Sequence, residues 1–266
     1  MGRPGLDLRL DFTNSACQAH ETDLKLDSFL VRSMYKGTYY EDKLSADKLF
    51  KCYEIATPRI KQYLDAEIQF VISNIQGADL VLELGCGYGR VMKAVSPFVS
   101  MIVGNDISRA SLELAKSHME PYRNYRLVQM DASNMAFRTG IFDAVFCIQN
   151  GISAFGVDKK CLIAESIRVT KNNGLILFSS YSPKIWKERL DWFRKQSLIG
   201  LLGEIDEQKT RSGTIVCKDG FKATTVSGKQ FIELFEEFEL DAFVIEVDNS
   251  SVFCKVIKKR KGFKTR

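Results

Sequence analysis

The chain has 266 residues, of which 45% are hydrophobic and 27% are charged, a composition typical of a globular protein with one large core or two small ones. These values exclude a wholly disordered chain, a collagen and a coiled coil. No apolar run approaches the roughly 18 residues that a membrane-spanning helix needs. The opening segment MGRPGLDLRLDF lacks the apolar stretch of a secretory signal, so we expect a cytoplasmic protein without a membrane partner.

The formal net charge of +5 would suggest a nucleic-acid partner, but this charge is concentrated at one end. The last nine residues, KKRKGFKTR, contain six of the 38 basic residues and no acid. The rest of the chain has 32 basic and 33 acidic residues, a net charge of −1. We therefore define residues 258–266 as a basic tail and connect any nucleic-acid binding with this tail.

Metal-binding patterns are missing from the sequence. The seven cysteines contain no CxxC pair, and there are only two histidines. Zinc sites usually require such clusters, so we expect no metal. Most of the cysteines should be buried thiols in a reducing compartment.

The N-terminal third predicts an extension followed by two helices. Residues 1–38 show little periodicity and are expected to be partly disordered. Residues 39–76 have helical spacing and form a predicted helical cap. Thr57 can cap the second of these helices, and Pro58 suits its first turn, where a missing N–H costs nothing.

From residue 77 onward, apolar strands alternate with helical segments. The predicted strands are 79–84, 100–106, 125–130, 142–149 and 174–180. A predicted helix follows the glycine cluster to about residue 95, and two more are predicted at 108–119 and 158–170. This alternation predicts a doubly wound, mostly parallel α/β sheet. After Ser182 we expect a helix at 183–196, a hairpin within 212–225, a helix at 227–238 and two strands at 242–247 and 251–257. Residues 77–257 are thus predicted to form one domain with an inserted hairpin.

A glycine cluster, Glu83-Leu84-Gly85-Cys86-Gly87-Tyr88-Gly89-Arg90, follows the first strand of this domain. Glycines between a strand and a helix allow a ligand to approach the backbone closely. The dinucleotide fingerprint GxGxxG requires glycine or alanine where Arg90 stands, which argues against an NAD-type pyrophosphate loop.

Acidic residues follow the next two strands. Asp106 ends the second strand and can accept hydrogen bonds from both hydroxyls of a ribose. Asp131 follows the third strand and can accept from the amine of an adenine. Each acid alone would be read as a turn or cap residue, but their order at successive strand ends with Glu83 indicates a nucleoside site.

The ordered segments ELGCGYGR, GNDIS, QMDASNMAF, FDAVFCIQNG and NNGLILFSS resemble the motifs of class I S-adenosylmethionine-dependent methyltransferases. The resemblance covers about residues 77–182. It implies a Rossmann-like, seven-stranded sheet in which one C-terminal strand is antiparallel. A cationic cofactor without phosphate also suits three acids and no lysine.

The resemblance implies roles for individual residues. The methionine part of S-adenosylmethionine, or of the product S-adenosyl-L-homocysteine, would lie against Glu83, Gly85, Cys86, Gly87 and Gly89. Ribose would bind at Asp106 and Ile107, and adenine at Asp131 and Ala132. Cofactor and acceptor would meet at Gln149 and Asn150. The helical cap would add Arg59, as a partner of the cofactor carboxylate, and Tyr40.

The acceptor is less defined. On the acceptor side we name Asn150 and Tyr181 as candidates, and no general base is evident. Our first hypothesis is a methyltransferase for a small-molecule acceptor. The alternatives are methylation of RNA, DNA or protein with help from the basic tail, a dinucleotide oxidoreductase, or a non-catalytic module that binds the adenosyl cofactor. Which atom is methylated, and the oligomeric state, do not follow from the sequence.

Overall fold

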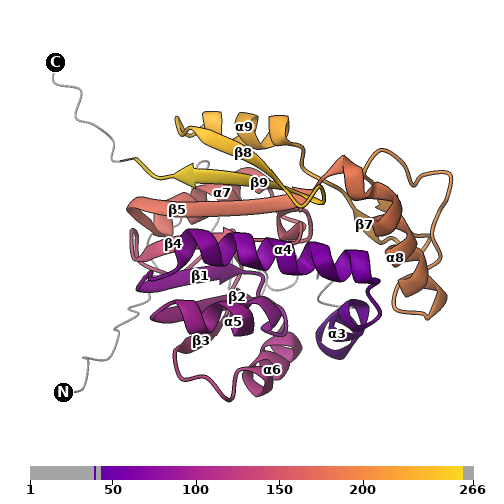
Figure 1. Cartoon of the computed structure of the whole chain (residues 1–266), viewed down its shortest axis with the longest axis horizontal. Coiled ribbons are helices and arrows are strands. Elements are labelled where there is room, and N and C mark those ends of the chain that lie inside the picture. Colours follow the sequence, from indigo (N-terminus) through magenta and orange to yellow (C-terminus); the bar gives the residue numbers. More distant parts are fainter. Residues whose placement is uncertain (1–38, 40–42, 260–266) are drawn as a thin grey trace, which may run out of the picture.

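The computed structural model describes Tyr39 and residues 43–259 (Figure 1). The predictions for residues 1–38, for Tyr40 and for residues 260–266 of the basic tail lie outside the described residues.

Seven strands form one sheet in the order β3-β2-β1-β4-β5-β9-β8. Their bounds are β1 Leu80–Leu84, β2 Met101–Asp106, β3 Tyr125–Gln129, β4 Phe142–Cys147, β5 Thr170–Tyr181, β8 Ala242–Val247 and β9 Ser251–Ile257. All neighbouring strands pair in parallel except β9, which is antiparallel to both β5 and β8. This arrangement confirms the predicted Rossmann-like α/β fold with an antiparallel C-terminal strand.

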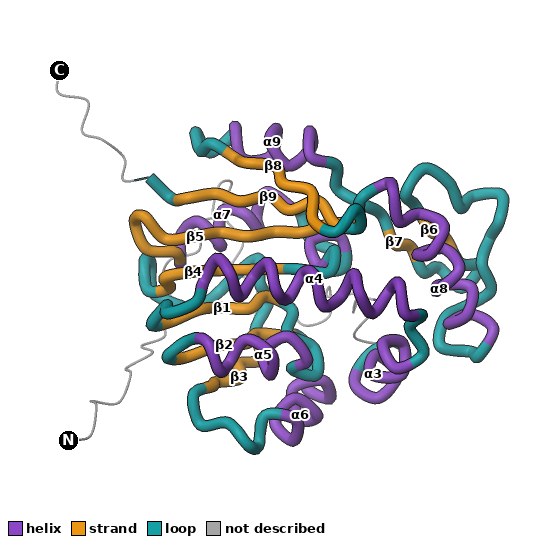
Figure 2. The backbone as a smooth tube through the Cα atoms, in the orientation of Figure 1, coloured by secondary structure: helices purple, strands orange, loops and turns teal. Residues whose placement is uncertain are grey.

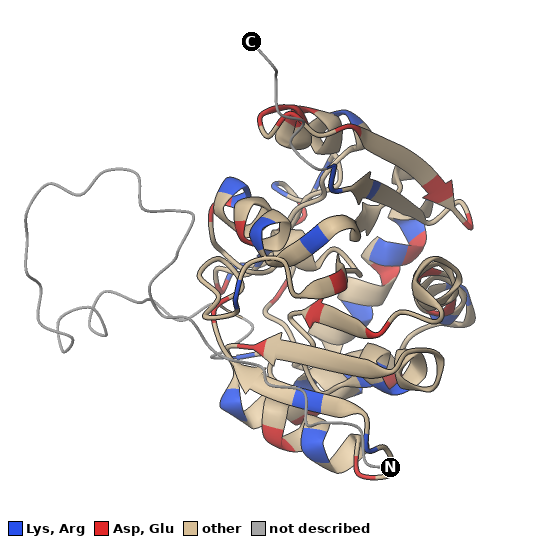
Figure 3. Ribbon diagram, turned by 90° about the vertical axis from the view of Figure 1, so that its left-hand side faces the viewer, with Lys and Arg blue, Asp and Glu red and all other residues tan. Residues whose placement is uncertain are grey.

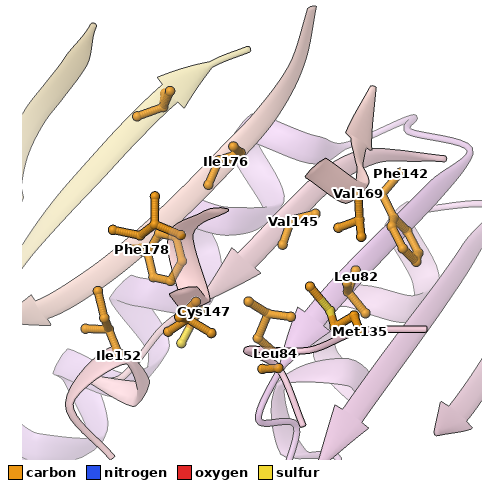
Figure 4. Packing of buried hydrophobic residues seen from close by; sticks show 14 of the residues in the cluster. Leu82, Leu84, Met135, Phe142, Val145, Cys147, Ile152, Val169, Ile176 and Phe178 are labelled. Atoms are coloured by element: carbon orange, nitrogen blue, oxygen red, sulfur yellow. The ribbon is translucent and has the colours of Figure 1, made fainter. Parts of the chain in front are cut away.

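Helices cover both faces of the sheet (Figure 2). The helices are α4 Pro58–Ile75, α5 Arg90–Val95, α6 Arg109–His118, α7 Lys159–Val169 and α9 Gly228–Glu236, with short 3-10 turns at Ser96–Phe98, Gly151–Ser153 and Pro183–Ile185. One buried cluster joins α4, α5 and α6 to the sheet, and a second joins α7 and α9 to the opposite face. Val145, Ile176 and Phe178 extend from neighbouring strands into this second layer (Figure 4). Parallel strands buried on both faces in this way read as near-continuous apolar runs.

A third buried cluster lies at the carboxyl end of β5 and joins segments that are distant in sequence. It includes residues of α3 (Ala46–Glu54) and α8 (Trp186–Leu198), and of the small sheet formed by β6 (Ile215–Val216) and β7 (Lys222–Ala223). The indole Nε1 of Trp192 donates to the backbone oxygen of Cys52 over 2.9 Å. This hydrogen bond joins helices α3 and α8 beyond the end of the sheet.

The start of α4 follows the sequence prediction. Thr57 accepts a hydrogen bond from the backbone N–H of Ile60 through its hydroxyl oxygen, and Pro58 occupies the first turn. The end of β4 differs from prediction, because this strand stops at Cys147 rather than at Gln149. Gln149 and Asn150 have φ values of 58° and 60°, a left-handed conformation that ends an extended strand.

Charged residues are mixed over the described surface. Figure 3 shows basic and acidic positions on the same helices rather than on separate faces. Within the described part of the chain, no helix is long and apolar enough to cross a membrane.

Candidate active site

A pocket of about 1280 Å³, including the part open to solvent, lies at the carboxyl ends of β1, β2 and β4. In a doubly wound sheet, ligands bind at this edge, where the strand order reverses. The order of the sheet reverses between β1 and β4, and the pocket lies at this point. The predicted residues that line it are Glu83, Gly85, Cys86, Gly87, Asp106, Ile107, Gln149 and Tyr181.

The glycine loop forms one wall of the pocket. Its three glycines have φ values of 67°, 52° and 81° at Gly85, Gly87 and Gly89, a region that residues with a side chain rarely adopt. A Cβ atom on Gly85 would also lie 3.0 Å from the ring of Phe155, which lines the same pocket. Glycine suits this loop because it adopts the left-handed backbone conformation without strain. At Gly85 the missing side chain also leaves room for the ring of Phe155.

Asp106 holds the glycine loop against the end of β2. Its Oδ2 accepts from the backbone N–H of Gly87, and its Oδ1 accepts from that of Ser108, each over 2.8 Å. Burial raises the pKa of Asp106, and the two backbone N–H groups oppose this rise. The carboxylate thus faces the pocket from a fixed position.

Glu83 and Arg90 face the pocket with buried polar atoms that have no hydrogen-bond partner. These atoms are Oε2 of Glu83 and Nη2 of Arg90. Burial raises the pKa of Glu83 well above its usual range, and the charge of Arg90 offsets part of the rise. The Arg90 guanidinium lies 4.7 Å from the ring centre of Tyr53 in α3. Buried polar groups are nearly always hydrogen-bonded in native proteins. The unpartnered atoms of Glu83 and Arg90 are therefore suited to bind a ligand that carries charged groups of its own.

Gln149 reaches the pocket from the turn after β4. Its Oε1 accepts from the hydroxyl of Tyr53 over 3.1 Å, whereas its buried Nε2 has no partner. The amide therefore offers a donor to a ligand.

Five predicted residues in the described part of the chain do not line the pocket: Arg59, Gly89, Asp131, Ala132 and Asn150. Gly89 caps α5, and Ala132 belongs to the core. Oδ1 of Asp131 accepts from the backbone N–H and the hydroxyl of Ser133, although the preceding residue Met130 does line the pocket.

Asn150 is committed to neighbouring elements. Its Nδ2 donates to the backbone oxygen of Thr224, and its Oδ1 accepts from the hydroxyl of Ser180. It is 6% exposed, and both polar atoms of its amide are engaged by these neighbours.

Arg59 lies away from the pocket and pairs with the turn between β8 and β9. Its Nη1 contacts Oδ2 of Asp248 at 2.6 Å, and its Nη2 donates to the backbone oxygen of the same residue. Because the guanidinium is already engaged, we expect Arg59→Ala to leave the affinity for a ligand in the pocket within twofold of wild type. It should lower the free energy of unfolding by about 1 kcal/mol, since the pair is only partly buried. Titration calorimetry and thermal unfolding would check both values, and a tenfold loss of affinity would place Arg59 in the site.

The far wall of the pocket is aromatic, and its two residues from α8 were not predicted as site residues. It is formed by Tyr53 of α3, Tyr181 at the end of β5, and Trp192 and Phe193 of α8. Such residues read as ordinary core positions in a sequence, and only the fold brings them to one pocket. Arg90 was also missed, although it stands directly after the glycine motif.

Comparison with known proteins agrees with this geometry. Residues 81–174 match the family model described as a methyltransferase domain. The chain is 34% identical over 110 residues to a malonyl-(acyl-carrier protein) O-methyltransferase of Legionella pneumophila, a match over 41% of this chain and 38% of that protein. The chain spans between 38% and 62% of the length of the curated relatives that it matches.

Solved structures share the fold at low sequence identity. The PH0226 protein of Pyrococcus horikoshii OT3 superimposes with a TM-score of 0.61 at 19% identity, over 81% of this chain and 100% of that one. The N-methyltransferase NodS of Bradyrhizobium japonicum WM9, solved with S-adenosyl-L-homocysteine, gives 0.56 at 11% identity, over 83% and 96%. The fold is Rossmann-like, and its pocket lies at the carboxyl edge of the sheet. The matched family model, over about a third of the chain, and the shared fold support a class I S-adenosylmethionine-dependent methyltransferase.

Proposed function

We propose that this protein transfers the methyl group of S-adenosylmethionine to a small-molecule acceptor. The observation that carries the proposal is the set of polar side chains facing one pocket: a buried carboxylate, Glu83, and a partly buried one, Asp106, beside a guanidinium, Arg90, and an amide, Gln149. This set matches a ligand that carries an amino group, a carboxylate and a ribose.

The residues present fit the cofactor group by group. Oε2 of Glu83, which has no hydrogen-bond partner, can accept from the amino group of the cofactor, and Nη2 of Arg90 can donate to the cofactor's carboxylate. Asp106 and the following Ile107 would hold the ribose. For the adenine, Met130 lines the pocket, while Asp131 and Ala132 come next in the chain.

When bound, S-adenosylmethionine supplies an activated methyl group on a sulfonium cation. The residues of this chain bind and orient the two reactants, which can provide a large share of the rate enhancement. The glycine loop and Asp106 hold the donor end, while Tyr53 and Gln149 are bonded to each other where the pocket meets α3. Trp192 and Phe193 exclude water from the far wall.

A small acceptor is favoured by how the pocket is covered. Residues of α3 and α8 line it, and the bond from Trp192 to Cys52 joins these helices over its far end. An RNA, DNA or protein acceptor would have to pass this aromatic cover.

Isothermal titration with S-adenosyl-L-homocysteine tests the cofactor, and deletion of residues 258–266 tests the acceptor class. We expect wild type to bind one equivalent and Glu83→Gln to bind more weakly. The tail deletion should leave methyl transfer and its salt dependence unchanged, because the tail is not needed for a small acceptor. Absence of binding by the folded wild type would refute the cofactor assignment, and a loss of salt dependence on deletion would favour a nucleic-acid acceptor.

A further inference from the structure

We propose that Glu67, in the middle of α4, is a positioning residue that holds the left-handed turn after β4 and so keeps the Gln149 amide in the pocket. This inference rests on the proposed function in one respect only, which is the choice of S-adenosyl-L-homocysteine as the ligand whose binding is measured. Glu67 lies outside the matched methyltransferase segment, residues 81–174, and outside the residues that line the pocket.

The turn after β4 needs external support. Gln149 and Asn150 are consecutive residues with side chains and with positive φ values of 58° and 60°. Each such residue costs about 1 kcal/mol or more relative to the right-handed region, and two in succession persist only when their surroundings fix them. Asn150 is fixed by its side-chain bonds to Thr224 and Ser180.

Gln149 is fixed through its backbone. Its N–H lies 2.7 Å from Oε2 of Glu67 and 2.8 Å from the hydroxyl oxygen of Ser179. The other oxygen of Glu67 accepts a short hydrogen bond from the hydroxyl of Ser251 at the start of β9. A fully buried carboxylate from α4 thus joins the turn after β4 to the antiparallel strand.

The stability of the fold alone does not explain why a carboxylate occupies position 67. Glu67 is 0% exposed, and its helix otherwise presents an apolar stripe to the sheet. Burying a carboxylate costs several kcal/mol unless its partners compensate, whereas an apolar residue at this position would carry no such cost. The backbone N–H that it binds belongs to the residue whose side chain enters the pocket. The geometry therefore connects the buried acid to the site through a single residue.

The experiment is a double-mutant cycle in the full chain, read by two independent measurements. The variants are Glu67→Ala, Gln149→Ala and the double substitution, with Glu67→Gln as the conservative variant and Ile68→Ala as the control. Ile68 is the next residue of α4 and is buried in the core, so its truncation destabilises the same helix without removing an acceptor from the turn. The first measurement is amide hydrogen exchange at Gln149 in the free protein. The second is the dissociation constant of S-adenosyl-L-homocysteine.

We expect Glu67→Ala to speed exchange at Gln149 at least tenfold and to weaken ligand binding about tenfold. Gln149→Ala should weaken binding by a similar factor, and the double variant should be no weaker than either single variant, because Glu67 acts through Gln149. Glu67→Gln retains an acceptor oxygen and should stay within about threefold of wild type. Ile68→Ala should lower the melting temperature but change neither measurement.

Additive losses in the double variant, or equal effects of Glu67→Ala and Ile68→Ala, would show that Glu67 is merely structural. If wild type does not bind the ligand, the proposed function fails, and exchange at Gln149 still decides whether Glu67 holds the turn. Should Glu67→Ala not fold, Glu67→Leu, which removes the acceptor but keeps most of the buried volume, takes its place in the comparison with Ile68→Ala. Faster exchange at Gln149 in Glu67→Leu than in Ile68→Ala would support the role, and equal exchange in both would contradict it.

Discussion

Replacing Asp106 with alanine should weaken the binding of S-adenosyl-L-homocysteine about 100-fold, which corresponds to about 2.7 kcal/mol. Two losses combine in this variant. The ribose hydroxyls lose a charged acceptor, a type of hydrogen bond that contributes about 1.5 to 3 kcal/mol. In addition, the backbone N–H of Gly87 loses its partner, and the glycine loop is no longer held against β2. Titration calorimetry measures the dissociation constant directly.

Asp143 provides a matched control for this experiment. It lies near the start of β4, and its Oδ2 accepts from the backbone N–H of Leu80 over 2.9 Å, so that it bonds a neighbouring strand much as Asp106 bonds the loop. It does not line the pocket. Asp143→Ala should lower thermal stability but keep the dissociation constant within twofold. Equal binding by wild type and Asp106→Ala would remove Asp106 from the site.

The second large effect concerns stability and pH. Burial raises the pKa of Glu67 from its ordinary value of 4.5 to about 7, while hydrogen bonds from Ser251, Ser179 and the backbone of Gln149 oppose the rise. A group whose pKa is raised by folding binds its proton more tightly in the folded state. Its contribution to stability is therefore complete below pH 4.5 and is lost as the pH rises to about 7. The size of this loss is on the order of 3 kcal/mol.

We therefore expect the free energy of unfolding of the ligand-free protein to fall between pH 5 and pH 8, and Glu67→Gln to flatten the profile. Burial also raises the pKa of Glu83 and of Asp106, so these carboxylates act in the same direction. The charged group facing Glu67 from α5 is Arg90, and the tyrosines Tyr63 and Tyr181 lie close by. Urea unfolding at a series of pH values measures the slope. A wild-type profile that rises over this range, or a Glu67→Gln profile as steep as that of wild type, would contradict the assignment.

The sequence predicted the sheet well because its signals are local. Buried parallel strands appear as apolar runs, and caps such as Thr57 and Ser227 mark where helices begin. Two strand boundaries were less accurate: β5 begins at Thr170, four residues before its predicted start, and β4 ends two residues early, since no residue type there announces a left-handed conformation. Glutamine at position 149 adopts it only because groups from α4 and β5 hold its backbone.

The predicted residues that line the pocket stand near the carboxyl ends of strands, Gln149 and Tyr181 among them. Glu83, the glycine loop and Asp106 are recognisable because the chain brings each to the end of its own strand. The aromatic wall and Glu67 come from segments far away in sequence, and their residue types are those of an ordinary core. Arg59 illustrates the opposite case, because a basic residue near a helix start suited a carboxylate ligand, yet the fold supplies Asp248 as its partner.

Residues of α3 and α8 cover the pocket, so substitutions in these helices and substitutions in the glycine loop are expected to have different effects. The donor end is built from the segment that matches the methyltransferase family, whereas both covering helices lie outside residues 81–174. Under the proposed function, we expect substitutions on these helices to change acceptor preference while the residues proposed to hold the cofactor stay unchanged. Trp192 and Phe193, which line the pocket from α8, are the positions at which to begin.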